Sequence, residues 1–491
     1  MYLSFKICII LTFGVTVECG KHFRLGRSSG GILKAAAEPV RHNAPAKWFN
    51  QKLDHFTPTD MRTWKQRYFV NDSFYDSKHG HIFLMVGGEG EANPLWIING
   101  TWIDYAEQFR ALCIMLEHRY YGASHPTSDL SVKNLQYLSS HQALADVANF
   151  IKAINEEYKL DSNRVKWIAF GGSYPGSLAA WLRVKFPHLV YASVSSSGPL
   201  QAKLNFNEYF QVVEQSLNAK TSSDDCVNSV KMAHKELEAL MEKSTSIVEK
   251  NFRVCVPFSK ANSYDVKNFY SNIADYFAEL VQYNEDNRLS VKPAYKNITI
   301  NSVCDMFTQS NEKPYKALVK LNDLMLEKNN ETCLEYSYSN MIKELRNTTF
   351  GNEGGRQWMY QTCTEFGFYQ TSSSETEMFG DYFPLDFFVK QCEDIFGPKF
   401  NEKFISSGIE WSNIDYGSKD IRATRVVFVH GSIDPWHALG ITSSMSSDTP
   451  AIFINGTAHC ADMYPRRDED SEELTQARLQ IQTHLETWLN V

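Results

Sequence analysis

The sequence of 491 residues predicts an α/β fold in which a helical segment interrupts the sheet. Three features support this prediction: short runs that are apolar on both faces, helical patterns between them, and a middle segment with few strand-like runs. Runs that are apolar on both faces are typical of parallel strands covered by helices. Their alternation with helices favours a sheet with right-handed crossovers.

Five runs are predicted to be strands, and each ends before a glycine or a polar residue: 81–86, 112–116, 165–170, 426–429 and 451–454. Helices are expected where apolar residues recur every 3.6 positions: 144–158, 178–185, 474–488 and, in the middle segment, 210–217 and 318–325. Ser139 and Ser140 are both candidate N-caps of the first helix. We therefore place the sheet in residues 46–203 and 381–491, and a helical insertion in residues 204–380.

Composition and charge exclude several classes of protein. Apolar residues make up 43% of the chain and charged residues 22%, which is ordinary for a globular protein and unlike a disordered or fibrous one. The formal net charge is -8 and no basic block could follow a phosphate backbone, so we expect no nucleic-acid partner. The cysteines show neither CxxC pairs nor zinc-like spacing, so we expect no metal site. No G-x-G-x-x-G motif follows the first predicted strand and no P-loop motif occurs, so we expect no cofactor.

The N-terminus predicts entry into the secretory pathway. Residues 1–19 have the pattern of a signal peptide, because Lys6 precedes a short apolar run that ends in small residues before Gly20. This run is shorter than the roughly 20 residues of a membrane-spanning helix, and we expect no membrane span. Residues 20–45 are rich in glycine, serine, alanine and arginine, which favours a flexible N-terminal or pro-segment.

Sequons and cysteines agree with an extracellular, lysosomal or endosomal location. Six candidate glycosylation sites occur: Asn71, Asn99, Asn297, Asn330, Asn347 and Asn455. Ten cysteines in a secreted chain indicate disulfides. Six of the eight that follow the signal peptide lie between residues 226 and 392, so the disulfides are expected to pin the helical insertion. The other two, Cys113 and Cys460, could be free.

A nucleophilic serine is predicted in the segment 165–176. An apolar strand runs into Gly171-Gly-Ser-Tyr-Pro-Gly176 and then into a helical pattern, which is the context of a nucleophile elbow at Ser173. Glycine must flank the serine in so tight a turn. The G-x-S-x-G pattern is incomplete, because Pro175 replaces the second glycine, although proline is acceptable in a first helical turn. A plain Gly-Ser turn is the alternative interpretation.

An acid and a base follow the last two predicted strands in the order that an α/β-hydrolase requires, Asp434 before His459. We predict a triad in which Ser173 attacks, His459 acts as the general base and Asp434 orients it. His430 and His437 are rival bases, but both lie too close to Asp434 along the chain to serve easily.

Two backbone amides are expected to form an oxyanion hole. One belongs to Tyr174, which directly follows the serine. The other comes from the glycine-rich loop 87–90, where Gly88 or Glu89 is the expected donor. A simple strand-ending turn is the alternative interpretation of this loop.

Eight ordered motifs extend from Trp48 toward the C-terminus: Phe49-Asn-Gln-Lys-Leu-Asp-His-Phe56, Gly87-Gly-Glu-Gly90, Glu117-His-Arg-Tyr-Tyr-Gly122, Phe170-Gly-Gly-Ser-Tyr174, Phe186-Pro-His188, Gln361-Thr-Cys-Thr-Glu-Phe366, Asp434-Pro-Trp436 and His459-Cys460-Ala-Asp462. Together they resemble the S28 family of serine peptidases, which includes Pro-Xaa carboxypeptidase, dipeptidyl peptidase 2 and thymus-specific serine protease. Ser177-Leu-Ala-Ala-Trp181 and Cys363-Thr-Glu-Phe-Gly-Phe-Tyr369 are most similar to the thymus-specific serine protease branch.

The resemblance implies an α/β-hydrolase fold with an inserted helical, disulfide-bonded cap domain, and it maps the triad onto the same three residues. It also implies the disulfides Cys226–Cys304, Cys255–Cys333 and Cys363–Cys392. Members of the family cleave peptides after proline-like residues near one chain end. Phe368 and Trp436 correspond to the wall of the proline pocket, and an aromatic wall suits a flat apolar ring. Pro175 departs from the family, whose members carry a small residue there.

The leading hypothesis is a secreted or lysosomal serine exopeptidase, acting on short peptides through an acyl-enzyme in carboxypeptidase or dipeptidyl-peptidase mode. A secreted esterase or lipase and an inactive hydrolase-fold binding protein are the alternatives. Glu89, Glu91 or Glu365 could bind a substrate amine, and Arg119 a carboxylate; the sequence leaves this choice open. Short peptides are the expected partners, and a homodimer is also left open.

Overall fold

The computed structural model describes residues 45–78, 81–161, 164–221, 223–285, 297–309, 312–351, 354–373 and 378–489. The predicted signal peptide and nearly all of the segment 20–45 lie outside the described residues. No helix in the described ranges is both long and apolar enough to cross a membrane.

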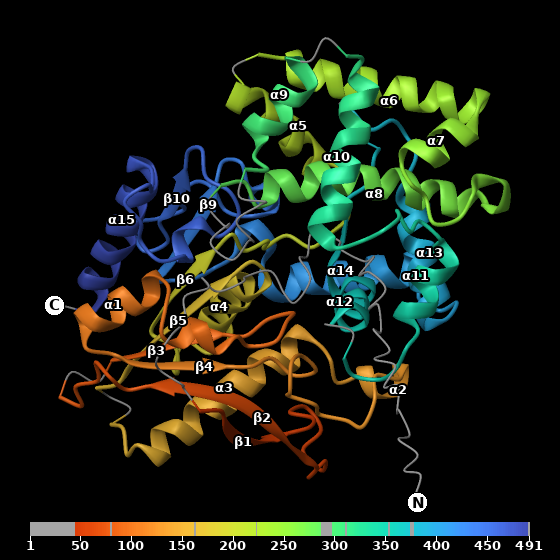
Figure 1. The fold of residues 1–491 in the computed structure, drawn as a ribbon. Coiled ribbons are helices and arrows are strands. Elements are labelled where there is room, and N and C mark those ends of the chain that lie inside the picture. Colours follow the sequence, from red (N-terminus) through yellow and green to blue (C-terminus); the bar gives the residue numbers. More distant parts are fainter. Residues whose placement is uncertain are drawn as a thin grey trace, which may run out of the picture.

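A mixed sheet of eight strands forms the base of the molecule, in the order β1-β2-β4-β3-β5-β6-β9-β10 (Figure 1). The strands are β1 (Lys47–Lys52), β2 (Thr63–Asn71), β3 (His81–Val86), β4 (Leu112–Leu116), β5 (Lys166–Gly172), β6 (Ala192–Ser196), β9 (Val426–Gly431) and β10 (Ala451–Ile454). β2 runs antiparallel to both of its neighbours, and all pairs from β4 to β10 are parallel. The carboxyl ends of these parallel strands therefore meet at one edge.

Both faces of the sheet are buried, as the apolar runs predict. On β3, Ile82 and Leu84 face one core together with α3 (Ser140–Glu157) and α4 (Tyr174–Lys185). Phe83 and Met85 face the opposite core together with α1 (Thr101–Phe109) and α15 (Glu472–Leu489). Alternation along a single strand thus supplies both layers. Ser139 rather than Ser140 caps α3, since its side chain accepts a hydrogen bond from Gln142 N.

The chain between β6 and β9 is largely helical. It contains α5 (Glu208–Thr221), α6 (Asp225–Lys243), α7 (Thr245–Asn251), α8 (Ser263–Gln282), α9 (Ile300–Thr308), α10 (Pro314–Asn329), α11 (Tyr338–Leu345), α12 (Gly355–Gln361), α13 (Leu385–Phe396) and α14 (Glu402–Tyr416), with a short parallel pair of β7 (Lys203–Asn205) and β8 (Gly367–Tyr369). Figure 1 shows α5 to α10 gathered at the end of the molecule away from β1 and β2. We call this group the cap. The domain boundaries at 203 and 380 stay a prediction.

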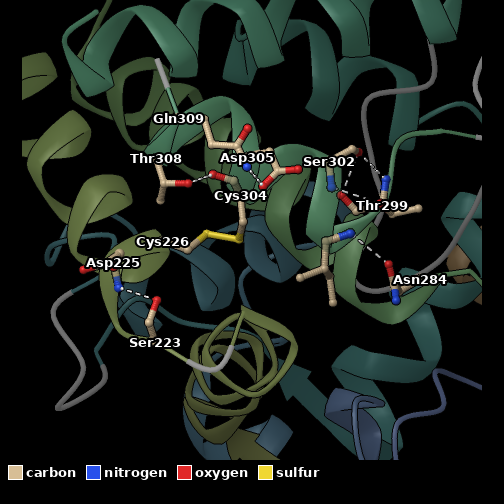
Figure 2. Close-up of a disulfide and its surroundings, with 11 residues drawn as sticks. Ser223, Asp225, Cys226, Asn284, Thr299, Ser302, Cys304, Asp305, Thr308 and Gln309 are labelled. Carbon is tan, nitrogen blue, oxygen red and sulfur yellow. Dashed lines mark hydrogen bonds between the residues drawn. A yellow bond between two sulfur atoms is a disulfide. The ribbon is translucent and has the colours of Figure 1, made fainter. Parts of the chain in front are cut away.

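Three disulfides brace the segment between β6 and β9. Cys226–Cys304 and Cys255–Cys333 each join residues 78 apart in sequence, and Cys363–Cys392 joins residues 29 apart. Figure 2 shows the first of these, between α6 and α9. They are the pairs that the resemblance implies, while Cys113 and Cys460 are free and buried. The predicted fold class, an α/β-hydrolase fold with a helical, disulfide-bonded insertion, is confirmed.

Candidate active site

Ser173 occupies the sharp turn between β5 and α4. Its backbone has φ 64° and ψ -130°, in the region that residues with a side chain rarely adopt. The turn is packed so tightly that a Cβ on Gly171 would lie 2.1 Å from the carbonyl oxygen of Pro175. Ser173 N donates a hydrogen bond to Ser196 O at 2.8 Å, which ties the turn to the end of β6. This strained strand-to-helix turn has the geometry of a nucleophile elbow.

Asp434 and His459 form a buried hydrogen-bonded pair. Asp434 follows β9, and its Oδ1 accepts hydrogen bonds from His459 Nδ1 at 2.8 Å and Trp436 N at 3.0 Å. Both residues of the pair are completely buried. His430 and His437 make no hydrogen bond to this carboxylate within the described part of the chain. The contact directs His459 Nε2 away from Asp434, as a general base requires.

The charges of this pair stabilise each other. Burial alone would lower the pKa of His459, but the charge and hydrogen bond of Asp434 raise it well above the ordinary value. Burial would also raise the pKa of Asp434, and the contact with His459 lowers it instead. By contrast, burial lowers the pKa of His430 to about 3, so this neighbouring imidazole stays neutral.

The end of β6 links the serine turn to the histidine loop. Ser196 O accepts the hydrogen bond from Ser173 N and a weaker one from Cys460 Sγ at 3.8 Å. Ser197 Oγ accepts from Cys460 N at 2.9 Å, directly beside His459. The structure therefore brings Ser173, Asp434 and His459 to the same edge of the sheet.

The glycine-rich loop after β3 packs against the start of α4. A Cβ on Gly88 would lie 2.2 Å from Pro175 Cγ, so the loop backbone touches the proline ring. A cavity of about 80 Å³ borders this contact and is lined in part by Glu89 and Gly172. Tyr174 N belongs to the first turn of α4, where helix geometry leaves amides without an intrahelical acceptor. Both predicted oxyanion elements thus flank the serine turn.

Phe368 and Trp436 are neighbours in an aromatic cluster. Their rings meet edge to face at 5.3 Å, and both are almost fully buried. The Trp436 ring lies 6.5 Å from the ring of His459. Phe206 packs against the Trp436 ring at 5.5 Å. The two residues that the resemblance maps to a proline pocket are therefore adjacent to the Asp434–His459 pair.

Two of the side chains considered for binding substrate termini are engaged inside the protein. Arg119 makes two hydrogen bonds of 2.6 Å to the carboxylate of Asp146. Glu365 accepts hydrogen bonds from Ser140 N at 2.9 Å and Ser140 Oγ at 2.6 Å, and burial raises its pKa to about 7. Glu91 is exposed and pairs with Arg67 at 2.8 Å. Glu89 alone lies in the glycine-rich loop beside the serine turn and is buried.

Sequence reasoning missed two groups that hold the site together. Ser196 ends β6 and Ser197 directly follows it, and no apolar run reveals this strand of mixed polarity. Gln282 ends α8 in the cap, 154 positions from Trp436, and donates and accepts hydrogen bonds beside the loops that carry Asp434 and His459. No local signal marks a residue whose partners lie so far along the chain.

Comparisons with known proteins extend over nearly the whole chain. The family model described as Serine carboxypeptidase S28 matches residues 51–481. A Caenorhabditis elegans protein named as a serine protease is 37% identical over 485 residues, covering 95% of this chain and 93% of that protein. Thymus-specific serine protease of Mus musculus is 34% identical, covering 95% of this chain and 90% of the relative. Lysosomal Pro-X carboxypeptidase of the same species is 29% identical, with 94% and 93% covered. Among solved structures, proline iminopeptidase of Mycobacterium smegmatis superposes with a TM-score of 0.38 over 90% of this chain and 99% of that chain, at 9% identity.

Proposed function

Because the chain belongs to the S28 family of serine peptidases, we propose that it is an exopeptidase that cleaves short peptides next to proline by means of Ser173, Asp434 and His459. The observation that carries this proposal is the buried hydrogen bond between His459 Nδ1 and Asp434 Oδ1 at the sheet edge that also bears the serine turn. A Ser-His-Asp arrangement on this scaffold performs acyl transfer.

The proposed reaction proceeds through an acyl-enzyme. Ser173 Oγ attacks the scissile carbonyl carbon while its proton passes to His459 Nε2, and Asp434 stabilises the imidazolium. The amides of Tyr174 and of Gly88 or Glu89 stabilise the negative oxygen of the tetrahedral intermediate. The C–N bond then breaks, and the leaving amine takes the proton from His459. A water molecule, deprotonated by His459, hydrolyses the ester and regenerates Ser173.

Preference for proline is proposed from the aromatic cluster beside the base. Phe368 and Trp436 meet edge to face next to His459, so a proline ring placed against them lies close to the reacting carbonyl. The name of lysosomal Pro-X carboxypeptidase supports this assignment, whereas the name of thymus-specific serine protease specifies no residue.

We place the enzyme in the lumen of the secretory pathway, either extracellular or lysosomal. Three disulfides favour an oxidising compartment. Four of the sequon asparagines are exposed and accessible to glycosylation: Asn297, Asn330, Asn347 and Asn455. Asn71 and Asn99 are half-buried, and Asn71 Nδ2 donates a hydrogen bond to Ile97 O, so these two are weaker candidates.

The test is a digest of Xaa-Pro-Xaa peptides blocked at the amino end, at the carboxyl end or at neither, between about pH 4 and pH 8. We expect the wild type to cleave at proline and to reject one of the two blocked series, which identifies the terminus that it needs. The Ser173→Ala variant should lose the activity while keeping its thermal stability. Cleavage by that variant contradicts the triad, and cleavage of esters but not peptides favours the esterase alternative.

A further inference from the structure

The last residue of α8 joins the cap to the two loops that carry the acid and the base. Gln282 is buried, and its side-chain Oε1 accepts hydrogen bonds from Trp436 Nε1 at 2.9 Å and from Tyr209 OH at 2.7 Å. Trp436 N in turn donates to Asp434 Oδ1. The side-chain amide of Gln282 therefore holds the indole of Trp436, and the backbone of Trp436 is hydrogen-bonded to the carboxylate of Asp434.

The same residue also holds the histidine loop. His459 N donates a hydrogen bond to Gln282 O at 3.1 Å, which links the backbone of His459 to the cap. Gln282 Nε2 donates to Tyr283 OH at 2.7 Å, and the Tyr283 ring meets the His459 ring at 6.3 Å and 89°. Gln282 and Tyr283 thus contact the backbone and the ring of His459, respectively.

The residue that follows Tyr283 is itself hydrogen-bonded to another helix of the cap. Asn284 Oδ1 accepts a hydrogen bond from Ile300 N at 2.9 Å, at the start of α9. Figure 2 shows this contact beside the Cys226–Cys304 disulfide, which fastens α9 to α6. Gln282 is therefore tied to the disulfide-braced cap as well as to the loops after β9 and β10.

We propose that Gln282 is a positioning residue through which the docked cap holds Trp436 and His459 in their catalytic arrangement. The proposal rests on the proposed function only in taking Ser173 and His459 as the reacting pair. Burying an amide costs free energy unless its polar atoms are hydrogen-bonded. Gln282 therefore favours the arrangement in which the loops that carry Trp436 and His459 both contact the cap. Small displacements of reacting groups then lower the rate strongly.

The test measures the rate of fluorophosphonate labelling in Gln282→Leu, which keeps the backbone contact and removes the side-chain hydrogen bonds. We expect labelling to be slower by about 10- to 100-fold. Gln282→Glu retains an acceptor for Trp436 and Tyr209 and should recover most of the rate. Tyr276→Phe is the matched control, because it removes one hydrogen bond of the same helix, from Tyr276 OH to Asn322 Oδ1 at 2.9 Å inside the cap.

If Gln282 has only a structural role, Gln282→Leu and Tyr276→Phe lower the melting temperature and leave the labelling rate within twofold of the wild type; this result overturns the proposal. Should Gln282→Leu fail to fold, Tyr209→Phe removes one of the two donors to Oε1 and is expected to slow labelling by about 3- to 10-fold. An unchanged rate in that variant also contradicts the proposal. Labelling does not require proline recognition, so a failure of the peptide digest leaves this test intact.

Discussion

The hydrogen bond between Asp434 and His459 determines the pH at which the proposed base is available. In the proposed mechanism His459 accepts the proton of Ser173 only when it is neutral, and its pKa is raised well above the ordinary value because of the Asp434 charge. Activity of the free enzyme should therefore fall as the pH is lowered through a pKa above that of an ordinary histidine, about 6.5.

The Asp434→Asn variant tests this account of the base. Without the carboxylate the pKa of His459 drops and its tautomer is no longer fixed, so we expect kcat/KM to fall by about 10⁴-fold. The remaining activity should have its acid limb at lower pH than the wild type. The measurement is the pH profile of kcat/KM from about pH 5 to pH 9. A loss below tenfold, or an unshifted acid limb, would count against the triad.

At the scale of elements, the loop after β3 and the first turn of α4 must fit each other. Gly88 has no side chain, and the ring of Pro175 fills the space where its Cβ would lie, 2.2 Å from Cγ. Gly88→Ala should push the loop away from Ser173 and lower kcat by about 10- to 100-fold, less than the roughly 100- to 1000-fold loss when an oxyanion donor is removed outright.

The double variant Gly88→Ala with Pro175→Ala is the control for this fit. Removing the ring makes room for the new methyl group, so most of the lost activity should return. The measurement is kcat, from steady-state kinetics, of Gly88→Ala, of the double variant and of Pro175→Ala alone. A double variant no more active than Gly88→Ala would show that the contact does not position the loop.

The sequence predicts some elements well and others not at all, for a physical reason. β3, β4 and β10 coincide with the predicted runs, because strands buried on both faces are uniformly apolar. β6 was missed because it contains Ser193, Ser195 and Ser196, which are buried by their neighbours in the sheet. No apolar run marks β1, an edge strand, or β2, which lies between β1 and β4, because both strands mix buried and exposed residues. The candidate triad could be selected from the sequence because each of its members follows a strand, and its catalytic role stays a prediction.

At the scale of the whole molecule, the cap depends on its disulfides. Cys226–Cys304 closes a long loop, with 78 positions between its ends, and joins α6 to α9. Replacing both cysteines by alanine should lower the free energy of unfolding by about 2–5 kcal/mol, chiefly because the unfolded chain gains freedom. Denaturant unfolding of this variant, compared with Cys113→Ala at a free buried cysteine, measures the difference. Equal losses in the two variants would contradict a bracing role.

The sequence alone does not predict the contacts between the cap and the sheet. Helical stripes indicate that the segment is helical, yet they cannot show that Gln282 reaches Trp436 and His459. Such contacts join residues about 150 or more positions apart and follow from how the cap docks on the sheet edge. Selecting Asp434 and His459 as candidates needed only chain order, while the contacts that Gln282 makes with Trp436 and His459 needed the structure.

Ser173 is the proposed nucleophile of this serine peptidase. Mapping the site of fluorophosphonate modification in the intact protein by mass spectrometry tests this role. We expect one adduct, on Ser173, that is prevented by prior denaturation and absent from Ser173→Ala and His459→Ala. An adduct on another residue, or undiminished labelling of Ser173→Ala, would contradict it.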